Sequence, residues 1–462
     1  MTTPPTFSFR EELKSILQLG WPMVLTQLFV MFNGTVDAAM AGHYSSLDLA
    51  GVSLGGMMMW PTFMLMTGLT MALTPIASQL RGAGRANEIG HQVRQGLWIC
   101  CVTSTLLVLV LFTARPLYLL VGVDAQAAEI AGAYLAALAW GVPPIVFYVA
   151  LRHISEGLGH TVPPMVIAGC ILPINAFLNY AFIYGEFGFP ELGGVGCGYA
   201  TAISFWLQFF MMMVVVRKPY FRATGLFDKF EAPNWRTVAS ISKVGIPIGF
   251  TVFLETAVFA VVGMLIAIHS VIEVAANSIA GNIGWATYVI PMSLGAAASI
   301  RVGFHVGSGN LYAARATAAT VYKFSIAYAV VVSGLLVLAR YLLVGIFSTD
   351  PAVVDVAATL ILFVAVYQLV DDSQAVTVGA LRGYKDTQVP MYISLVGYWV
   401  IAIPLGYALA NGHLAAGLAP GVYGYWTGLT VGLSVVAVAV GIRLWHTSSD
   451  HSRIQRLSAL EA

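Results

Sequence analysis

Long apolar stretches, separated by short polar segments, run along almost the whole chain. Twelve of them are long enough to cross a bilayer as helices, because a spanning helix needs roughly 20 mainly apolar residues. The predicted spans cover residues 16–41, 51–77, 94–113, 128–150, 163–185, 196–216, 240–268, 275–300, 317–345, 352–376, 388–410 and 418–443. The pattern therefore predicts an all-α integral membrane protein with 12 transmembrane helices.

The second half of the chain repeats the first. A shift of 225 positions aligns SILQLGWP (15–22) with SISKVGIP (240–247), and the same shift pairs Trp60 with Trp285. Each half contains an even number of helices, so both halves enter the membrane from the same side. Parallel repeats of this kind place the substrate site of a transporter between the two halves.

The repeat predicts four parts: an N-terminal six-helix lobe (1–216), a cytoplasmic linker (217–238), a C-terminal six-helix lobe (239–446) and a cytoplasmic tail (447–462). If both termini lie on one side, that side holds all 22 Lys and Arg residues except Arg115 and Arg340. The positive-inside rule then predicts that both termini are cytoplasmic. For a bacterial chain, the expected location is the inner membrane.

Composition excludes several classes of function. Only 9% of the residues are charged, against about 25% in soluble domains, and the mean hydropathy is +0.82. A net charge of +1 gives no footprint for nucleic acid. The four cysteines lack metal-ligand spacing, and the chain contains neither GxSxG nor HExxH, so no enzyme is expected.

Four carboxylates nevertheless lie inside predicted spans: Asp37, Glu255, Asp371 and Asp372. A charged side chain inside a bilayer costs at least a few kcal/mol, so each acid is a candidate for function by default. Their counterparts in the other half are all apolar. The two halves therefore share a scaffold but not their ionisable groups.

In the second half, two acids are predicted at similar depth. Glu255 lies 12 residues from Lys243 and Asp371 lies 11 residues from Arg382, so both fall near the middle of the bilayer. Tyr367 lies one helical turn from Asp371 on the same face. The sequence predicts a site of Glu255, Asp371 and Tyr367 that binds a coupling ion or substrate, with the two carboxylates as ligands of sodium or another monovalent cation.

In the first half, Asp37 is expected near the outer side of the membrane. Asn175 and Asn179 stand four residues apart on one helix, and Thr201 lies near the outer start of the next. One acid with amide and hydroxyl oxygens suits a proton or a sodium ion. Hydrogen bonding that only holds helices together is the alternative for the amides and the threonine.

Three further residues are candidates for supporting roles. Asp372 points about 100° away from Asp371 on a helix, so at most one of the two need face a given site. Trp285 is aromatic and suits a cavity that accepts cations, although helix packing also explains it. Asn33 precedes Asp37 by one helical turn and is the third candidate for a supporting role.

The stretch VDAAMAGHYSSLDLAGVSLG (36–55), together with Glu255 and Asp371, identifies a family resemblance. Over essentially its whole length, the chain resembles the multidrug and toxic compound extrusion (MATE) transporters, specifically their NorM branch. The resemblance implies a V-shaped pair of six-helix lobes. It also implies export of cationic, often aromatic drugs and dyes in exchange for sodium or protons.

The resemblance assigns roles to individual residues. It implies that Glu255, Asp371 and Tyr367 correspond to the cation site of the second lobe. Asp37 corresponds to the acid of the first lobe, and Asn175, Asn179 and Thr201 match positions that line a polar site there. Some relatives carry an acid where this chain has Asn179, which weakens the case for sodium in the first lobe.

The predicted function is multidrug efflux by antiport through alternating access, in a monomer that needs no cofactor besides the coupling ion. The partners are cationic drugs and the lipid bilayer, without nucleic acid. A lipid-linked oligosaccharide flippase of the same broad superfamily is the alternative. Such a protein should line its cavity with cations, whereas the buried ionisable residues predicted here are all acids.

Overall fold

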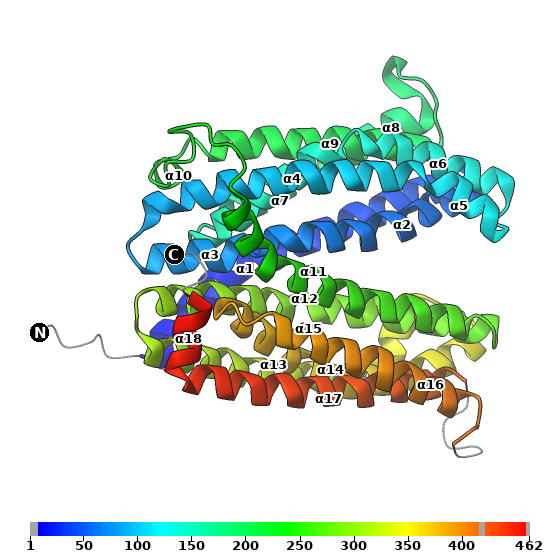
Figure 1. Cartoon of the computed structure of the whole chain (residues 1–462). Coiled ribbons are helices and arrows are strands. Elements are labelled where there is room, and N and C mark those ends of the chain that lie inside the picture. The colour runs from blue at the N-terminus through cyan, green and yellow to red at the C-terminus, as the bar shows by residue number, and fades with distance from the viewer. Residues whose placement is uncertain (1–7, 415–420, 459–462) are drawn as a thin grey trace, which may run out of the picture. The chain divides into compact units, whose positions relative to one another are not determined.

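A computed structural model describes residues 8–414 and 421–458, which contain helices and turns and no strand (Figure 1). The first half contains α1 (Phe9–Tyr44), α2 (Ser46–Met71), α3 (Leu73–Gly82), η1 (Ala86–Glu88), α4 (Ile89–Phe112), α5 (Ala114–Val121), α6 (Ala125–Ala139), α7 (Val142–Gly157), α8 (Val162–Tyr184), η2 (Glu186–Gly188), α9 (Gly194–Val215) and α10 (Pro219–Arg222). The second half contains α11 (Trp235–Ile266), α12 (Val271–Gly307), α13 (Leu311–Gly345), α14 (Pro351–Gly383), α15 (Gln388–Ser394), the π-helix η3 (Leu395–Ala402), α16 (Ile403–Ala410), α17 (Val422–Ser449) and α18 (His451–Ser458).

The predicted spans correspond to these helices. In the described residues, 11 helices are long and apolar enough to cross a membrane, and the number is 12 if α6 and α7, which are bent by 55°, are counted as one span. The bend falls where Pro143 and Pro144 open α7, because proline cannot donate the hydrogen bond that would continue α6. The start of the last predicted span, residues 418–420, lies outside the described residues.

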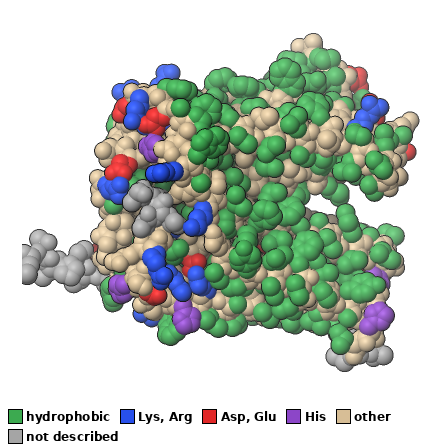
Figure 2. All heavy atoms as spheres, viewed as in Figure 1, with side chains coloured by type: hydrophobic (Ala, Val, Ile, Leu, Met, Phe, Trp, Pro, Cys, Tyr) green, Lys and Arg blue, Asp and Glu red, His purple; other side chains and the backbone are tan. Residues whose placement is uncertain are grey.

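Exposed apolar side chains cover the helices. Leu338 is 86% exposed and Met264 is 69% exposed, which suits contact with lipid. On the face shown in Figure 2, hydrophobic side chains cover the middle of the helices, while Lys and Arg gather near α10 and α18. The chain is a multi-pass membrane protein.

One compact unit comprises residues 21–249. In it, α8 packs against α9, α2 packs against α6, and α9 packs against α6 and α7. Its core is a large cluster of buried aliphatic and small side chains that includes Leu73, Val93 and Leu135. Hydrogen bonds from Asn179 of α8 and Thr201 of α9 to Asp37 place α1 beside these two helices.

The other unit comprises residues 1–20 and 250–462, of which residues 8–20, 250–414 and 421–458 are described. Its central helix is α14, which packs against α12, α13 and α17. A Cβ atom on Gly379 would lie 2.1 Å from the carbonyl oxygen of Gly295, so α14 and α12 approach as closely as their backbones allow. Small residues commonly permit such close crossings between membrane helices.

The two compact units divide the chain inside α1, after Gly20, and inside α11, after Gly249, whereas the repeat predicts lobes separated by residues 217–238. The reason in α11 is a glycine contact with α2. A Cβ atom on Gly68 would lie 2.1 Å from the Cα of Gly249, and one on Gly245 would lie 2.5 Å from the carbonyl oxygen of Leu69. The first part of α11 is therefore packed into the unit that precedes it.

A buried ion pair explains the division in α1. Glu12 accepts hydrogen bonds from Arg301 Nε at 2.9 Å and Arg301 Nη2 at 2.6 Å, and from Thr317 Oγ1 at 2.9 Å. Arg301 lies on α12 and Thr317 on α13. The start of α1 is thus fixed to the unit that holds the second half of the chain.

The predicted linker, 217–238, is also fixed in place. Glu231 accepts hydrogen bonds from Arg94 Nη2 at 3.1 Å and Lys229 Nζ at 2.8 Å, and His91 Nδ1 lies 2.5 Å from it. Burial alone would raise the pKa of Glu231, but these hydrogen bonds lower it to about 2. The linker therefore packs along α4 and leads directly into α11, which begins at Trp235.

The predicted tail, 447–462, contains the end of α17 and all of α18, and residues 459–462 lie outside the described part. Ile454 of α18 is buried in a cluster with Val302 and Tyr384. Through Ile454, α18 packs against its own unit.

Candidate functional site

The first polar cluster lies among α1, α8 and α9 and is centred on Asp37. Asn179 Nδ2 donates a hydrogen bond of 2.6 Å to Asp37 Oδ1, and Thr201 Oγ1 donates one of 3.2 Å to Asp37 Oδ2. Asn179 Nδ2 also lies 2.9 Å from Asn175 Oδ1. The structure thus brings together four residues that the sequence predicted as one group.

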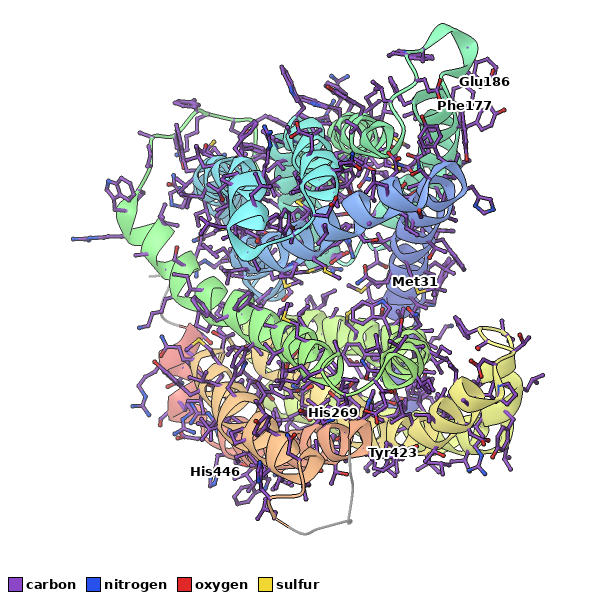
Figure 3. The ribbon with its side chains drawn as sticks, turned by 90° about the vertical axis from the view of Figure 1, so that its right-hand side faces the viewer. Met31, Phe177, Glu186, His269, Tyr423 and His446 are labelled. Atoms are coloured by element: carbon purple, nitrogen blue, oxygen red, sulfur yellow. The ribbon has the colours of Figure 1, made fainter. Side chains whose placement is uncertain are left out.

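The polar face of α8 turns inward. Asn175 and Asn179 are fully buried, whereas Phe177 between them is 53% exposed. Figure 3 looks along the helices and labels Phe177 together with Glu186, just beyond the end of α8. The spacing of four residues therefore places both amides on the helix face that meets Asp37.

Sequence reasoning missed Ser204. Its hydroxyl lies 3.4 Å from Asn175 Nδ2, the same distance as Thr201 Oγ1, and Ser204 is fully buried. Ser204 follows Thr201 by three residues on α9, so helical spacing was a signal that could have found it. The cluster therefore contains a second hydroxyl.

Two amide oxygens near Asp37 are buried and lack hydrogen-bond partners among the described residues: Asn33 Oδ1 and Asn179 Oδ1. A buried polar atom without a partner is costly and calls for an explanation. With the carboxylate and the hydroxyls, these oxygens form a set of hard ligands of the kind that alkali and alkaline-earth cations prefer.

The second polar cluster lies between α11 and α14. Gln374 Nε2 donates a hydrogen bond of 2.8 Å to Glu255 Oε1. Asp371 interacts electrostatically with Glu255, and Tyr367 interacts with both acids. The predicted group of Glu255, Asp371 and Tyr367 is therefore brought together, and Gln374 joins it.

Several aromatic side chains belong to the same region of the second half. Tyr367 is 6% exposed, and its ring meets those of Phe259 and Trp426 edge-on at 6.0 and 5.9 Å. Tyr288 and Tyr398 interact electrostatically with Glu255 and Asp371. Tyr367 thus packs against other aromatic rings, and three tyrosines interact electrostatically with the two acids.

Tyr398 lies on the π-helix η3, and the sequence carried no clear signal for its role. The next residue, Trp399, donates a hydrogen bond of 3.3 Å from Nε1 to the carbonyl oxygen of Leu254 on α11. Segments of π-helix are rare and are frequently found at functional sites. In this chain, η3 places two aromatic side chains beside the helix that carries Glu255.

Arg382 corrects the expectation that all buried ionisable residues are acids. It is half-buried on α14 and interacts electrostatically with Glu255 and Tyr288. An arginine side chain is long enough for its charge to act at a distance from its own Cα. A permanent cation therefore acts on Glu255 in the second cluster.

Asp372 belongs to a separate network. Gln368 Nε2 donates a hydrogen bond of 2.5 Å to Asp372 Oδ1, and Thr287 Oγ1 of α12 lies 3.1 Å from Gln368 Oε1. Asp372 is fully buried. Asp371 and Asp372 thus leave α14 toward different neighbours, as their 100° separation predicts.

Trp285 is connected to the second cluster only indirectly. Its side chain is 50% exposed, and its ring centroid lies 5.9 Å from that of Tyr288. Tyr288 in turn interacts electrostatically with both acids.

The described residues contain no group of three or more His, Cys, Asp and Glu side chains that could hold a metal ion. Each cluster instead offers one or two carboxylates with neutral oxygens. This donor set suits a proton or a singly charged cation better than a transition metal.

Comparison with known proteins identifies the family. A family model described as MatE matches the chain twice, over residues 22–181 and 247–408. The chain belongs to the MatE family. The two MatE matches begin 225 positions apart (247 − 22), which is the shift found in the sequence. Family membership and the internal repeat therefore agree.

Individual relatives cover nearly the whole chain. The multidrug resistance protein MdtK of Yersinia pseudotuberculosis is 38% identical over 436 residues, which covers 94% of this chain and 95% of MdtK. The eukaryotic MATE transporter AtDTX14 superposes with a TM-score of 0.85 at 23% identity, over 97% of this chain and 99% of AtDTX14.

A third relative comes from Pyrococcus furiosus and is described as a transporter of the MOP superfamily whose binding pocket has reverse polarity, suggesting a different function. Its TM-score is 0.83 at 19% identity, over 98% of this chain and 97% of the other. At this level of identity, the two solved structures show the MATE fold but do not assign a substrate.

Proposed function

We propose that the chain is a multidrug efflux transporter. It exports cationic, often aromatic drugs and dyes by antiport against sodium or protons. The observation that carries this proposal is the pair of acids in membrane-spanning helices, Glu255 and Asp371, which interact with each other and with the aromatic-packed Tyr367. The similarity to multidrug resistance proteins named MdtK supports it.

The chemistry of the second cluster suits exchange between two kinds of cation. A carboxylate away from water is costly as a free anion, so it holds a proton or another cation. A cationic aromatic drug satisfies the same carboxylate and also stacks on the tyrosines. Ion and drug therefore compete for Glu255 and Asp371, and entry of one releases the other.

Arg382 supplies a positive charge when neither ion nor drug is bound. Its guanidinium interacts with Glu255 and compensates part of the carboxylate charge. A drug or ion must therefore displace this interaction. The empty site is thereby stabilised until the next ion or drug binds.

The first cluster serves as a coupling-ion site. Asp37 with the oxygens of Asn33, Asn175, Asn179, Thr201 and Ser204 binds a proton or sodium. Asn179 positions the carboxylate of Asp37 by donating a hydrogen bond to it, and Asn175 contacts Asn179 in turn. The helices that carry the cluster respond to its charge, because an uncompensated charge and a neutral acid favour different packing.

Transport follows alternating access, in which the site opens to one side of the membrane at a time. The chain lies in the bacterial cytoplasmic membrane with both termini in the cytoplasm, acts as a monomer and catalyses no chemical reaction. The positive-inside distribution of Lys and Arg supports this orientation.

A flippase for lipid-linked oligosaccharides is the second candidate. For the Pyrococcus furiosus transporter of the same fold, the reversed polarity of the binding pocket is described as suggesting a different function. Arg382 is a cation that a phosphate would bind, but two acids outnumber it in the same cluster. The balance of charge favours cationic cargo.

Expression in a drug-sensitive bacterium tests the proposal. The wild-type chain should raise resistance to ethidium and tetraphenylphosphonium and lower their accumulation. Unchanged resistance and accumulation, with the protein present in the membrane, would reject drug efflux.

A further inference from the structure

The carboxylate of Asp372 is the most completely buried acid of the second half that the proposed exchange does not use. Its exposed fraction is 0%, and Oδ2 has no hydrogen-bond partner among the described residues. The one side-chain donor to Oδ1 is the neutral amide of Gln368, at 2.5 Å. A carboxylate in such a place is poorly stabilised as an anion.

The titratable groups that act on Asp372 do not compensate its charge. Those that interact with it electrostatically are Asp371 on α14, Tyr288 on α12 and Tyr328 on α13. All three are neutral or negative. A charge on Asp372 would also repel a charge on Asp371, so the two neighbours do not readily ionise together.

A chain of hydrogen bonds leads from Asp372 to α12. In the ionised form, Gln368 Nε2 donates to Asp372 Oδ1, and Thr287 Oγ1 donates to Gln368 Oε1 at 3.1 Å. Thr287 Oγ1 also lies 2.9 Å from the carbonyl oxygen of Gly284. The carbonyl oxygen of Ile283 lies 3.2 Å from the same hydroxyl, so Thr287 has three acceptors for its one hydrogen.

The same atoms accommodate the protonated form after a half-turn of the Gln368 amide. A proton added to Asp372 Oδ1 forms an O–H group that donates to Gln368 Oε1. The amide nitrogen then donates to Thr287 Oγ1, and the threonine hydrogen moves to the carbonyl oxygen of Gly284. Every bond of the chain is kept with its direction reversed, since an amide presents a donor and an acceptor at similar positions.

We propose that Asp372 is a proton-binding site of the C-terminal half, separate from Glu255 and Asp371, and that Gln368 is the amide that turns when this proton binds or leaves. Protonation of Asp372 removes a negative charge beside Asp371 and reverses the hydrogen bonds to Thr287 on α12. Thr287 is adjacent to Tyr288, which interacts with the two acids of the cation site. The proton is thereby linked to that site.

The use of this proton in transport rests on the proposed antiport, but its binding does not. The test is therefore spectroscopic. Infrared difference spectra between acidic and alkaline buffer are recorded on the purified full-length protein in lipid, with isotope-labelled aspartate to separate Asp from Glu. We expect a protonated-aspartate carbonyl band that is lost in Asp372→Asn and kept in Asp371→Asn and Glu255→Gln. A spectrum of Asp372→Asn identical to wild type would overturn the proposal.

Gln368→Met removes the amide and keeps the acid. It therefore tests the proposed pairing of Gln368 with Asp372 even if Asp372→Asn fails to fold. The matched control is Gln374→Met on the same helix, since Gln374 contacts Glu255 instead. The aspartate band should shift in Gln368→Met and stay in place in Gln374→Met. An unshifted band in Gln368→Met would overturn the amide switch.

If neither a pH gradient nor a sodium gradient drives efflux in the wild type, the proposed antiport is rejected. The infrared spectra still decide whether Asp372 binds a proton.

Discussion

Gln374 Nε2 lies 2.8 Å from Glu255 Oε1, so a neutral amide on α14 holds a carboxylate on α11. The hydrogen bond joins the helix that carries Glu255 to the helix that carries Asp371. Under the proposed function, the two acids form one site for a cation.

Removal of this hydrogen bond should weaken cation binding without abolishing it. Hydrogen bonds to charged groups contribute roughly 1.5–3 kcal/mol, so Gln374→Met should weaken binding of tetraphenylphosphonium by about 10- to 100-fold. Glu255→Gln should eliminate measurable binding. Calorimetry on the purified protein measures the affinity of both variants. Wild-type affinity in Glu255→Gln would exclude Glu255 as a residue that binds the cation.

Arg382 should compete with the cargo. Arg382→Gln removes the positive charge that interacts with Glu255, so tetraphenylphosphonium should bind severalfold more tightly. Arg382→Lys is the matched control because it keeps the charge, and it should stay close to wild type. Weaker binding in Arg382→Gln would instead mean that the arginine supports the site.

Asp37 should be required for transport even though it lies in the other unit. Asp37→Asn removes the negative charge and keeps the size of the side chain, so the protein should insert and fold while efflux stops. Thr35→Ala, an exposed residue on the same helix, is the control and should export normally. Normal efflux of ethidium from cells that carry Asp37→Asn would exclude Asp37 from coupling.

The glycine crossing between α2 and α11 should be needed for stability. A Cβ atom on Gly68 would lie 2.1 Å from the Cα of Gly249, so Gly68→Ala forces the helices apart. Gly263→Ala on α11 meets no atom within 4 Å and should be neutral or stabilising by up to about 1 kcal/mol, the usual helix preference for alanine. Thermal unfolding in detergent compares the two, and equal melting temperatures would show that the crossing tolerates a methyl group.

Apolar periodicity and the repeat predicted the helices well because lipid requires long uninterrupted spans. The helical spacing also predicted which polar residues lie together. Asn175 and Asn179 are four residues apart and therefore share one face of their helix. The boundaries between units were not predictable in this way. They depend on the Gly68 contact and on the pairing of Glu12 with Arg301, both of which join residues far apart in sequence.

The candidate site was predicted only in part, because some of its contacts also join residues far apart in sequence. The acids are conspicuous because a charge in an apolar span is costly. Gln374 and Tyr398 are not conspicuous, since amides and tyrosines occur in many membrane helices. In the sequence, Arg382 serves only as a reference residue on the cytoplasmic side. Spacing along a helix gives the position of its Cα but not the position of the charge on its long side chain.

Gradient-driven dye efflux from vesicles tests the central claim most directly. Purified protein in sealed vesicles is given a pH gradient alone and then a sodium gradient alone, with the Glu255→Gln variant as control. Antiport predicts that at least one gradient drives ethidium against its own concentration gradient in the wild type and that neither does so in the variant. Ethidium movement that responds to neither gradient, or that is the same in Glu255→Gln, would contradict the account.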